Sequence, residues 1–187
     1  MSPNMMNTFV VYVENKPGVL TRVASLFRRR AFNIDSLTVG RTEKPEVSRM
    51  TITVDADRDQ ARRIEANLYK LVNVLLVENI THQPAIVRDL AMIKVAATHE
   101  ARSHVLELAS VFRARVVDVA PESLTIEITG AEDKIDGLLE VLRPYGVMEM
   151  VRTGIVAMRR GSNSPTITTA GSGLAHVAAD DDVSYSV

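Results

Sequence analysis

The 187-residue sequence contains no cysteine and no tryptophan, and aromatic residues make up only 4% of it. Without cysteine, the chain cannot form a disulfide, supply a thiolate nucleophile or bind a metal through sulfur, which fits a reducing compartment. A ferredoxin-like sheet that binds RNA needs exposed aromatic side chains on its central strands. We therefore expect a cytoplasmic protein that does not bind nucleic acid.

Neither sign of charge dominates, because 22 basic residues face 23 acidic ones and the net charge is -1. Such a balance provides no general attraction to nucleic acid or to an anionic membrane. No apolar run approaches the roughly 18 residues of a membrane span, and the first residues, MSPNMMNTF, lack the pattern of a signal peptide. We expect no membrane association, and partners must be inferred from local features.

Hydrophobic residues in the first half of the chain change from strand to helix period and back. Helical spacing is found within residues 19–27 and 61–71. Strands are expected at residues 8–13, 33–39, 50–54 and 72–77. The resulting order, β-α-β-β-α-β, is typical of a ferredoxin-like fold, with four antiparallel strands and two helices on one face.

The same order repeats in the second half. Strands are expected at residues 90–97, 116–119, 124–128 and 147–151, and helices at 105–112 and 135–142. The letters also repeat, since MTITV at 50–54 resembles LTIEI at 124–128 and LFRRR at 26–30 resembles VFRAR at 111–115. We predict an α+β protein of two tandem ferredoxin-like domains, residues 6–81 and 86–160, joined around residues 82–85.

The composition changes after Gly161, where the sequence continues SNSPTITTAGSG and then reaches three consecutive aspartates at 180–182. This stretch is poor in residues that pack a core. We predict a flexible tail at residues 161–187, with the acidic run as a solvated terminus rather than a metal site.

The stretch ENKPGVL at 14–20 joins the first expected strand to the first helix. A helix N-terminus has backbone N–H groups without intrahelical partners and a partial positive charge, so it attracts anions. Gly18 lets a ligand approach the backbone, Pro17 stiffens the turn, and Asn15 offers an amide to a carboxylate or an ammonium group. An ordinary strand-to-helix turn also fits these residues. The second half of the chain has no equivalent of the Asn-x-x-Gly motif, which favours a functional role for this motif in the first half.

Longer strings carry a family resemblance. ENKPGVL at 14–20, FNIDSLTV at 32–39 and SRMTI at 48–52 resemble the amino-acid-binding ACT domain of the small regulatory subunit of acetohydroxyacid synthase, also called acetolactate synthase. In the second half, VDV at 117–119 and the segment from LRPYG at 142 to VRTG at 154 are similar to that family's C-terminal domain. The resemblance extends from Thr8 to Gly161.

The resemblance implies a homodimer formed through ACT domains, with valine, leucine or isoleucine bound between two protomers. The residues it implies for this site are Asn15, Pro17, Gly18, Val19 and Leu20 from one protomer and Asn33 and Ile34 from the facing one. Lys16 and Ala31 depart from the family's usual residues, a small polar or acidic residue and a glycine. If that glycine has positive φ, Ala31 strains the turn.

The implied function is that of a non-catalytic subunit in branched-chain amino acid biosynthesis. It would activate a large catalytic subunit that carries thiamine diphosphate, magnesium and FAD, and convey feedback inhibition by valine, while binding none of those cofactors itself. A stand-alone ACT-type sensor that controls another enzyme or a transcription factor shares only the first domain. An enzyme of ferredoxin-like fold is disfavoured, because no nucleophile, base and orienting group come together in the sequence.

Three further motifs have simpler explanations. His99 and His104 are five residues apart, whereas a zinc-protease helix needs two histidines four apart on one face, so we expect solvated residues at the helix start. The run of arginines at 28–30 fits the C-terminus of a helix, where cations are favoured. Met50, Met148 and Met150 fall within strands and are expected to pack a core or meet a partner.

Overall fold

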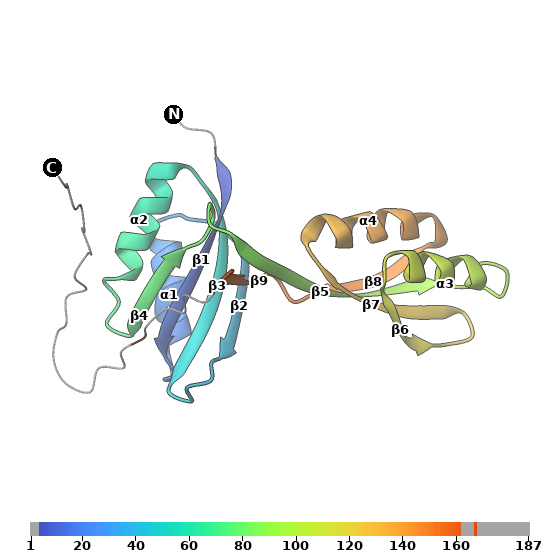
Figure 1. The fold of residues 1–187 in the computed structure, drawn as a ribbon, viewed down its shortest axis with the longest axis horizontal. Helices are drawn as coiled ribbons and strands as arrows, with labels where there is room; N and C mark the ends of the chain where they lie inside the picture. Colours follow the sequence, from blue (N-terminus) through green and yellow to red (C-terminus); the bar gives the residue numbers. More distant parts are fainter. Residues whose placement is uncertain (1–3, 162–166, 168–187) are drawn as a thin grey trace, which may run out of the picture.

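The structure is a computed structural model that describes residues 4–161 and residue 167. The predicted flexible tail, residues 161–187, lies outside the described residues apart from Gly161 and Ile167. Two antiparallel sheets, each with two helices on one face, follow one another along the molecule (Figure 1). This arrangement confirms the predicted α+β fold with two tandem ferredoxin-like units.

The first unit has the strand order β2-β3-β1-β4, with antiparallel neighbours throughout. Its elements are β1 (Met5–Glu14), α1 (Val19–Arg29), β2 (Ile34–Arg41), β3 (Val47–Ala56), α2 (Arg58–Leu68) and β4 (Val74–Asn79). Alternate residues of β1, among them Phe9 and Val11, point towards the helices and meet Val23 and Phe27, which are four residues apart on one face of α1. Each such buried side chain contributes roughly 1.5–3 kcal/mol to folding.

The start of α2 is fixed by a reciprocal cap. The Gln60 amide donates to Asp57 Oδ1 (2.8 Å), and the Asp57 amide donates to Gln60 Oε1 (2.9 Å). Two N–H groups that the helix leaves without partners are therefore satisfied. By contrast, α1 begins at Gly18 with no side-chain cap, so the two helices of this sheet differ at their N-termini.

The second unit has the strand order β6-β7-β5-β8. Its elements are β5 (Ala85–Ala96), α3 (Arg102–Val111), β6 (Arg115–Val119), β7 (Ser123–Gly130), α4 (Glu132–Leu142), the 3-10 helix η1 (Arg143–Tyr145) and β8 (Val147–Arg152). The central strands place Ile93 and Ile126 against Leu138 of α4, all three without measurable exposure. The second unit thus has a core of its own.

A ninth strand, β9 (Val156–Arg159), was not expected from the sequence. It pairs with the first part of β5, from Ala85 to Arg88, whereas β5 from Asp89 onwards pairs with β7 and β8. β5 therefore begins at the first unit and ends inside the second (Figure 1). Ala85, which was expected in the connection between the domains, is the first residue of this strand.

A third hydrophobic cluster lies on the face of the first sheet that the helices do not cover. Val10 and Tyr12 of β1 point to this face and are covered by Ala157 of β9, which is only 2% exposed. An ion pair between Arg159 Nη1 and Glu78 Oε1 (3.0 Å) ties β9 to β4. The first sheet is thus packed on both faces, by its own helices and by the β5–β9 ribbon.

Both units end their first helix in the same way. Ala31 and Arg113 have φ values of 56° and 52°. The next amide along donates to the carbonyl five residues back in each case, from Phe32 to Phe27 (3.1 Å) and from Ala114 to Ala109 (2.8 Å). This pattern is a left-handed helix terminus that usually carries glycine. The positive φ confirms that Ala31 is strained.

Replacing Ala31 by glycine is therefore expected to stabilise the protein. The left-handed conformation costs an L residue about 1–2 kcal/mol, and the greater freedom of glycine in the unfolded chain costs roughly 0.5–1 kcal/mol, which leaves a net gain of about 0.5–1 kcal/mol. The midpoint of urea unfolding measures this gain. The matched control Ala24→Gly, inside α1, should lose about 1 kcal/mol; equal losses in both variants would contradict the strain at Ala31.

Candidate functional site

The turn before α1 presents backbone donors that the protein leaves unused. Gly18 is the N-cap with φ +80°, and no side chain caps the helix. Within the part of the chain that the structure describes, the amides of Gly18, Leu20 and Thr21 have no hydrogen-bond acceptor, while the Val19 amide reaches Lys16 O at 3.4 Å. A Cβ built on Gly18 would have no atom within 4 Å. The backbone here is open to a ligand.

Asn15 holds this turn against the loop between β2 and β3. Its backbone amide donates to Glu46 O (2.7 Å), and its side-chain Nδ2 donates to Pro45 O (2.9 Å). The Oδ1 atom of Asn15 has no donor within the described residues and can accept from an ammonium group. Asn15 therefore fixes the turn and still offers an acceptor beside Gly18.

The unusual Lys16 is paired with its neighbour. Lys16 Nζ lies 2.9 Å from Glu14 Oε1, and Asn73 donates to the other oxygen of Glu14 while accepting from Arg22. Hydrogen bonds from Lys16 and then Asn73 lower the pKa of Glu14 below its ordinary value. The extra positive charge of Lys16 is thus largely balanced at the turn.

The seven residues implied by the family resemblance form two separate groups. Leu20 is 44% exposed beside Gly18 and Pro17, whereas the Val19 side chain is 4% exposed and belongs to the core. Val19 can therefore meet a ligand only through its backbone. Asn33 is exposed and lies one residue before β2, where Ile34 is partly buried.

These two groups lie at opposite ends of the first sheet. Ile34 is paired with Val54, Val54 is paired with Asn7, and the turn follows Glu14 at the other end of β1. Seven residues of extended strand span about 23 Å. The structure does not bring the two groups together within one chain, so a shared site requires a second copy.

β2 is an edge strand of the first sheet. One side of it pairs with β3, and within residues 4–161 no strand pairs with its other side. Free backbone groups on an edge strand are a template for pairing with another chain. At this edge, the first unit of another copy of the chain could pair with β2.

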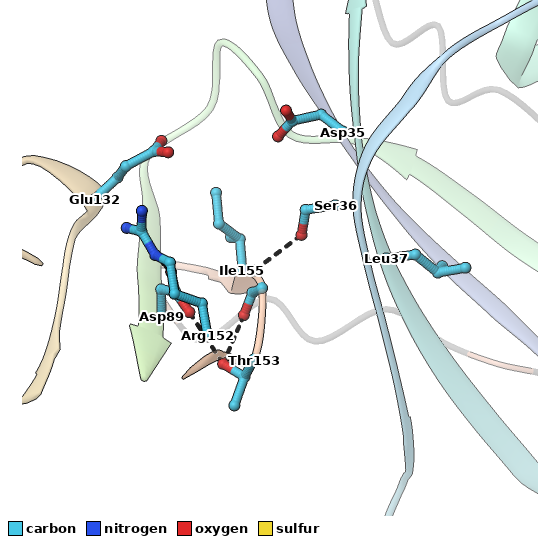
Figure 2. A pocket seen from close by; sticks show the side chains of 9 residues that line it. Asp35, Ser36, Leu37, Asp89, Glu132, Arg152, Thr153 and Ile155 are labelled. Carbon is cyan, nitrogen blue, oxygen red and sulfur yellow. Dashed lines mark hydrogen bonds and ion pairs between the residues drawn. The ribbon is translucent and has the colours of Figure 1, made fainter. Parts of the chain in front are cut away.

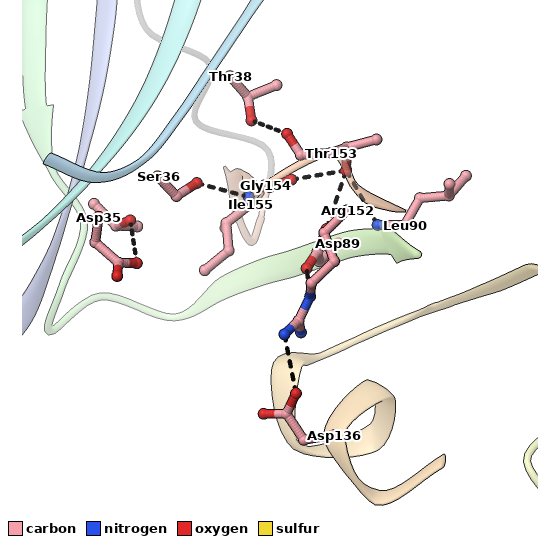
Figure 3. A network of polar contacts seen from close by, with 11 residues as sticks. Asp35, Ser36, Thr38, Asp89, Leu90, Asp136, Arg152, Thr153, Gly154 and Ile155 are labelled. Carbon is pink, nitrogen blue, oxygen red and sulfur yellow. Dashed lines mark hydrogen bonds and ion pairs between the residues drawn. The ribbon is translucent and has the colours of Figure 1, made fainter. Parts of the chain in front are cut away.

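A polar network lies where the first and second units meet (Figure 3). Asp89 of β5, only 5% exposed, accepts from Arg152 Nε (2.8 Å) and from Thr153 Oγ1 (3.1 Å), and Arg152 Nη1 lies 2.9 Å from Asp136 Oδ1 of α4. Burial lowers the pKa of Arg152, but its hydrogen bonds and ion pairs with Asp89 and Asp136 together outweigh this effect, and the pKa is raised. Arg152 therefore stays charged and links β5, β8 and α4.

A cavity of about 380 Å³ lies beside this network (Figure 2). Residues of β2 line one side of it, and residues of β5, α4, the end of β8 and the β8–β9 connection line the other. Its lining residues are Asp35, Ser36, Leu37, Asp89, Glu132, Arg152, Thr153, Gly154 and Ile155. It is therefore a space shared by both units.

The structure also shows where the other motifs of the sequence lie. His99, in the turn before α3, and His104, in the first turn of α3, are both exposed. The described residues hold no group of three or more histidine or acidic side chains placed to bind a metal. Arg28 and Arg29 lie in the last turn of α1. Met50 is buried at 1% exposure, whereas Met148 is 63% exposed. Among residues 4–161 and 167, no helix is long and apolar enough to cross a bilayer.

Comparison with known proteins matches both units. A family profile described as "AHAS small subunit-like ACT domain" matches residues 9–76, and one described as "Small subunit of acetolactate synthase" matches residues 88–161. A protein of Archaeoglobus fulgidus named "Probable acetolactate synthase small subunit" is 49% identical over 158 residues, covering 84% of this chain and 99% of its own. The chain belongs to the acetolactate synthase small-subunit family.

Other members of the small-subunit family agree with this assignment. The acetolactate synthase small subunit of Mycobacterium bovis is 48% identical over 161 residues, covering 86% of this chain and 95% of its own. The crystal structure of the small subunit from Thermotoga maritima is 40% identical, with a TM-score of 0.79, and the match covers 85% of this chain and 99% of that one. The resemblance identified from the sequence is confirmed, and the ACT assignment of the first unit with it.

Sequence reasoning missed the residues at the junction between the units. Asp89 is an acidic residue in the apolar stretch that became β5, and it is followed by alternating buried residues. A charged residue at such a position is rarely buried unless it is paired. The pairing of Asp89 with a cationic side chain could therefore have been predicted from the sequence. Its partner Arg152 lies in the string VRTG, which was used only for family resemblance.

Proposed function

We propose that the chain is a non-catalytic, cytoplasmic regulatory subunit that activates the large subunit of acetolactate synthase and conveys feedback inhibition by valine. The open backbone donors at Gly18, on a chain of the small-subunit family, are the observation that carries this proposal. Residues 6–81 form the amino-acid-binding ACT domain, and residues 86–160 form the domain that contacts the catalytic subunit. The thiamine diphosphate, magnesium and FAD belong to that partner.

The turn matches both charged ends of an amino acid. The free amides of Gly18, Leu20 and Thr21 are donors for the carboxylate, and the partial charge of the helix N-terminus adds to their attraction. Asn15 Oδ1 accepts from the ammonium group. Hydrogen bonds to a charged group contribute about 1.5–3 kcal/mol each, so two or three of them with a small apolar contact reach the roughly 8 kcal/mol of a micromolar ligand.

The apolar side of the site is completed by a second copy. Leu20 is exposed next to the turn, and Ile34 of the facing protomer supplies an apolar wall suited to a branched side chain. Asn33 of that protomer, at the start of its edge strand, offers an additional amide. A homodimer through the ACT domains, with the two β2 edges at its centre, places these groups together, and a ligand bound there is sensitive to how the protomers are arranged.

Mixing the purified chain with the large subunit of the same organism tests the proposal. We expect the rate of acetolactate formation from pyruvate to rise severalfold on mixing and to fall again when valine is added. The chain alone should form no acetolactate. Acetolactate formed without the large subunit, or a mixed rate equal to that of the large subunit alone, would refute the proposed role.

A further inference from the structure

β2, which starts at Ile34 of the proposed effector site, also contacts the second unit of the same chain. Thr38 Oγ1 donates to Thr153 O (3.2 Å), and Ser36 Oγ accepts from the Ile155 amide (3.1 Å) (Figure 3). Ser36 and Thr38 lie in β2 a few residues after Ile34, its first residue, and after Asn33, which precedes it. Any displacement of β2 would therefore act directly on the β8–β9 connection, residues 153–155.

Gly154 makes this contact close. Its φ of +82° belongs to the left-handed region, and a Cβ placed there would lie 2.6 Å from Ser36 Oγ and 3.1 Å from Thr38 Oγ1. Only a residue without a side chain lets the connection lie directly on the two hydroxyls. Only the short side chains of Ser36 and Thr38 therefore separate the connection from the backbone of β2.

The other end of the contact is anchored in the second unit. Thr153 Oγ1 has one proton and two acceptors within reach, Asp89 Oδ1 (3.1 Å) and Gly154 O (2.9 Å). The Leu90 amide donates to Thr153 Oγ1 at 3.2 Å. Arg152 continues the chain of contacts from Asp89 to Asp136 of α4. Contacts through Thr153, Asp89 and Arg152 thus connect β2 to α4 of the second unit.

The junction also has room for a second arrangement. Arg152 Nη2 is buried and has no hydrogen-bond partner within the described residues. Asp35 of β2 and Glu132 of α4 line the same cavity as Arg152, and Figure 2 shows both carboxylates around it. A cavity of about 380 Å³, with spare donors on one residue and further carboxylates on its walls, permits a change of partners in a way that a packed core does not.

We propose that the contact of Ser36 and Thr38 with residues 153–155 transmits occupancy of the effector site to the second unit. This inference rests on the proposed function, because it names how binding at that site regulates the catalytic partner. Valine binding shifts β2, β2 shifts the connection, and the connection resets the Asp89–Arg152–Asp136 network. Coupling of this kind is reciprocal, so the large subunit changes valine affinity by the same factor as valine changes affinity for the large subunit.

The double variant S36A/T38V tests this, since it removes both side-chain hydrogen bonds and nearly preserves shape. We expect calorimetry to give a valine Kd within threefold of wild type and activation of the large subunit to be retained. For each protein, the valine affinity is measured with and without the large subunit, and the ratio of the two values is taken. In S36A/T38V this ratio should be at least fivefold closer to 1 than in wild type, and inhibition by valine should be correspondingly weaker.

The control variant T98V/S110A makes the same chemical changes in the second unit, at side chains with no hydrogen bond to β2, and should keep the wild-type ratio. If S36A/T38V binds valine and keeps the wild-type ratio, the junction is not the transmitter. If only S36A/T38V loses valine binding, these residues act at the site itself and the proposal also fails. If the wild-type chain itself binds no valine, the proposed effector site fails first.

Discussion

Replacing Gly18 by aspartate is expected to abolish inhibition by valine while the fold and the activation of the large subunit persist. The carboxylate of the new side chain would occupy the position proposed for the carboxylate of valine and bond to the free amides there. Losing two charge-assisted hydrogen bonds of about 1.5–3 kcal/mol each lowers affinity at least 100-fold, since each 1.4 kcal/mol is about tenfold. Calorimetry with valine measures the loss directly.

Gly18→Asn is the matched control for this variant. Asparagine has nearly the shape of aspartate, both tolerate a left-handed backbone, and no atom lies within 4 Å of a Cβ at this position. The neutral variant should therefore carry the same strain without the repulsion, and we expect it to retain valine affinity within about tenfold of wild type. Equal affinities in the two variants would show that charge at Gly18 is irrelevant and that the carboxylate of the ligand lies elsewhere.

Replacing Asp89 by alanine is expected to destabilise the protein by about 2–3 kcal/mol. Removing one member of a buried ion pair costs about 3–5 kcal/mol, and we take a lower value because the side chain of Arg152 is 23% exposed and keeps Asp136. Thr153 Oγ1 loses one of its two acceptors in the same change and keeps Gly154 O. Urea unfolding followed by circular dichroism gives the difference in midpoint.

The carboxylate of Glu149 provides the comparison. It lies on β8 in the same sheet and pairs with Lys94 at 3.5 Å, but both side chains are exposed, at 66% and 41%. Exposed ion pairs contribute about 0.2–1 kcal/mol. Glu149→Ala should therefore lower the free energy of unfolding by less than about 1 kcal/mol. A loss in Asp89→Ala no larger than the loss in Glu149→Ala would mean that the buried network adds nothing to stability.

The order of the first eight strands and four helices could be predicted because the two hydrophobic periods are clear in most of them. β9 could not, since four residues with one buried side chain, Ala157, are too short for a period to be visible. The sequence similarity between residues 26–30 and 111–115 aligns the two units with an offset of three residues from their structural alignment, because the structurally equivalent helix ends are at Ala31 and Arg113. The packing of each helix on its sheet, rather than residue identity, determines this alignment.

The turn at Gly18 was predictable because its chemistry is local, in a helix start without a cap and a glycine that leaves the backbone open. The separation of Asn33 from it was not visible in the sequence, since it follows from strand pairing across the whole sheet. Burial of the Val19 side chain follows from the same helical period that predicted α1, so its backbone-only role could have been inferred. The junction depends on contacts between residues more than one hundred positions apart, such as Ser36 and Ile155, for which one sequence has no signal.

Because β5 belongs to the second sheet and also to the β5–β9 ribbon that covers the first, the halves of this molecule are poorly separable. A fragment ending at residue 81 would keep every element of the first sheet but lose β9 and the start of β5, and Val10 and Tyr12 would then face water. Apolar sheet surface of that kind promotes self-association. Studies that isolate the amino-acid-binding half should therefore retain residues 85–88 and 155–159 in some form, joined by a short artificial loop, if a monodisperse sample is the aim.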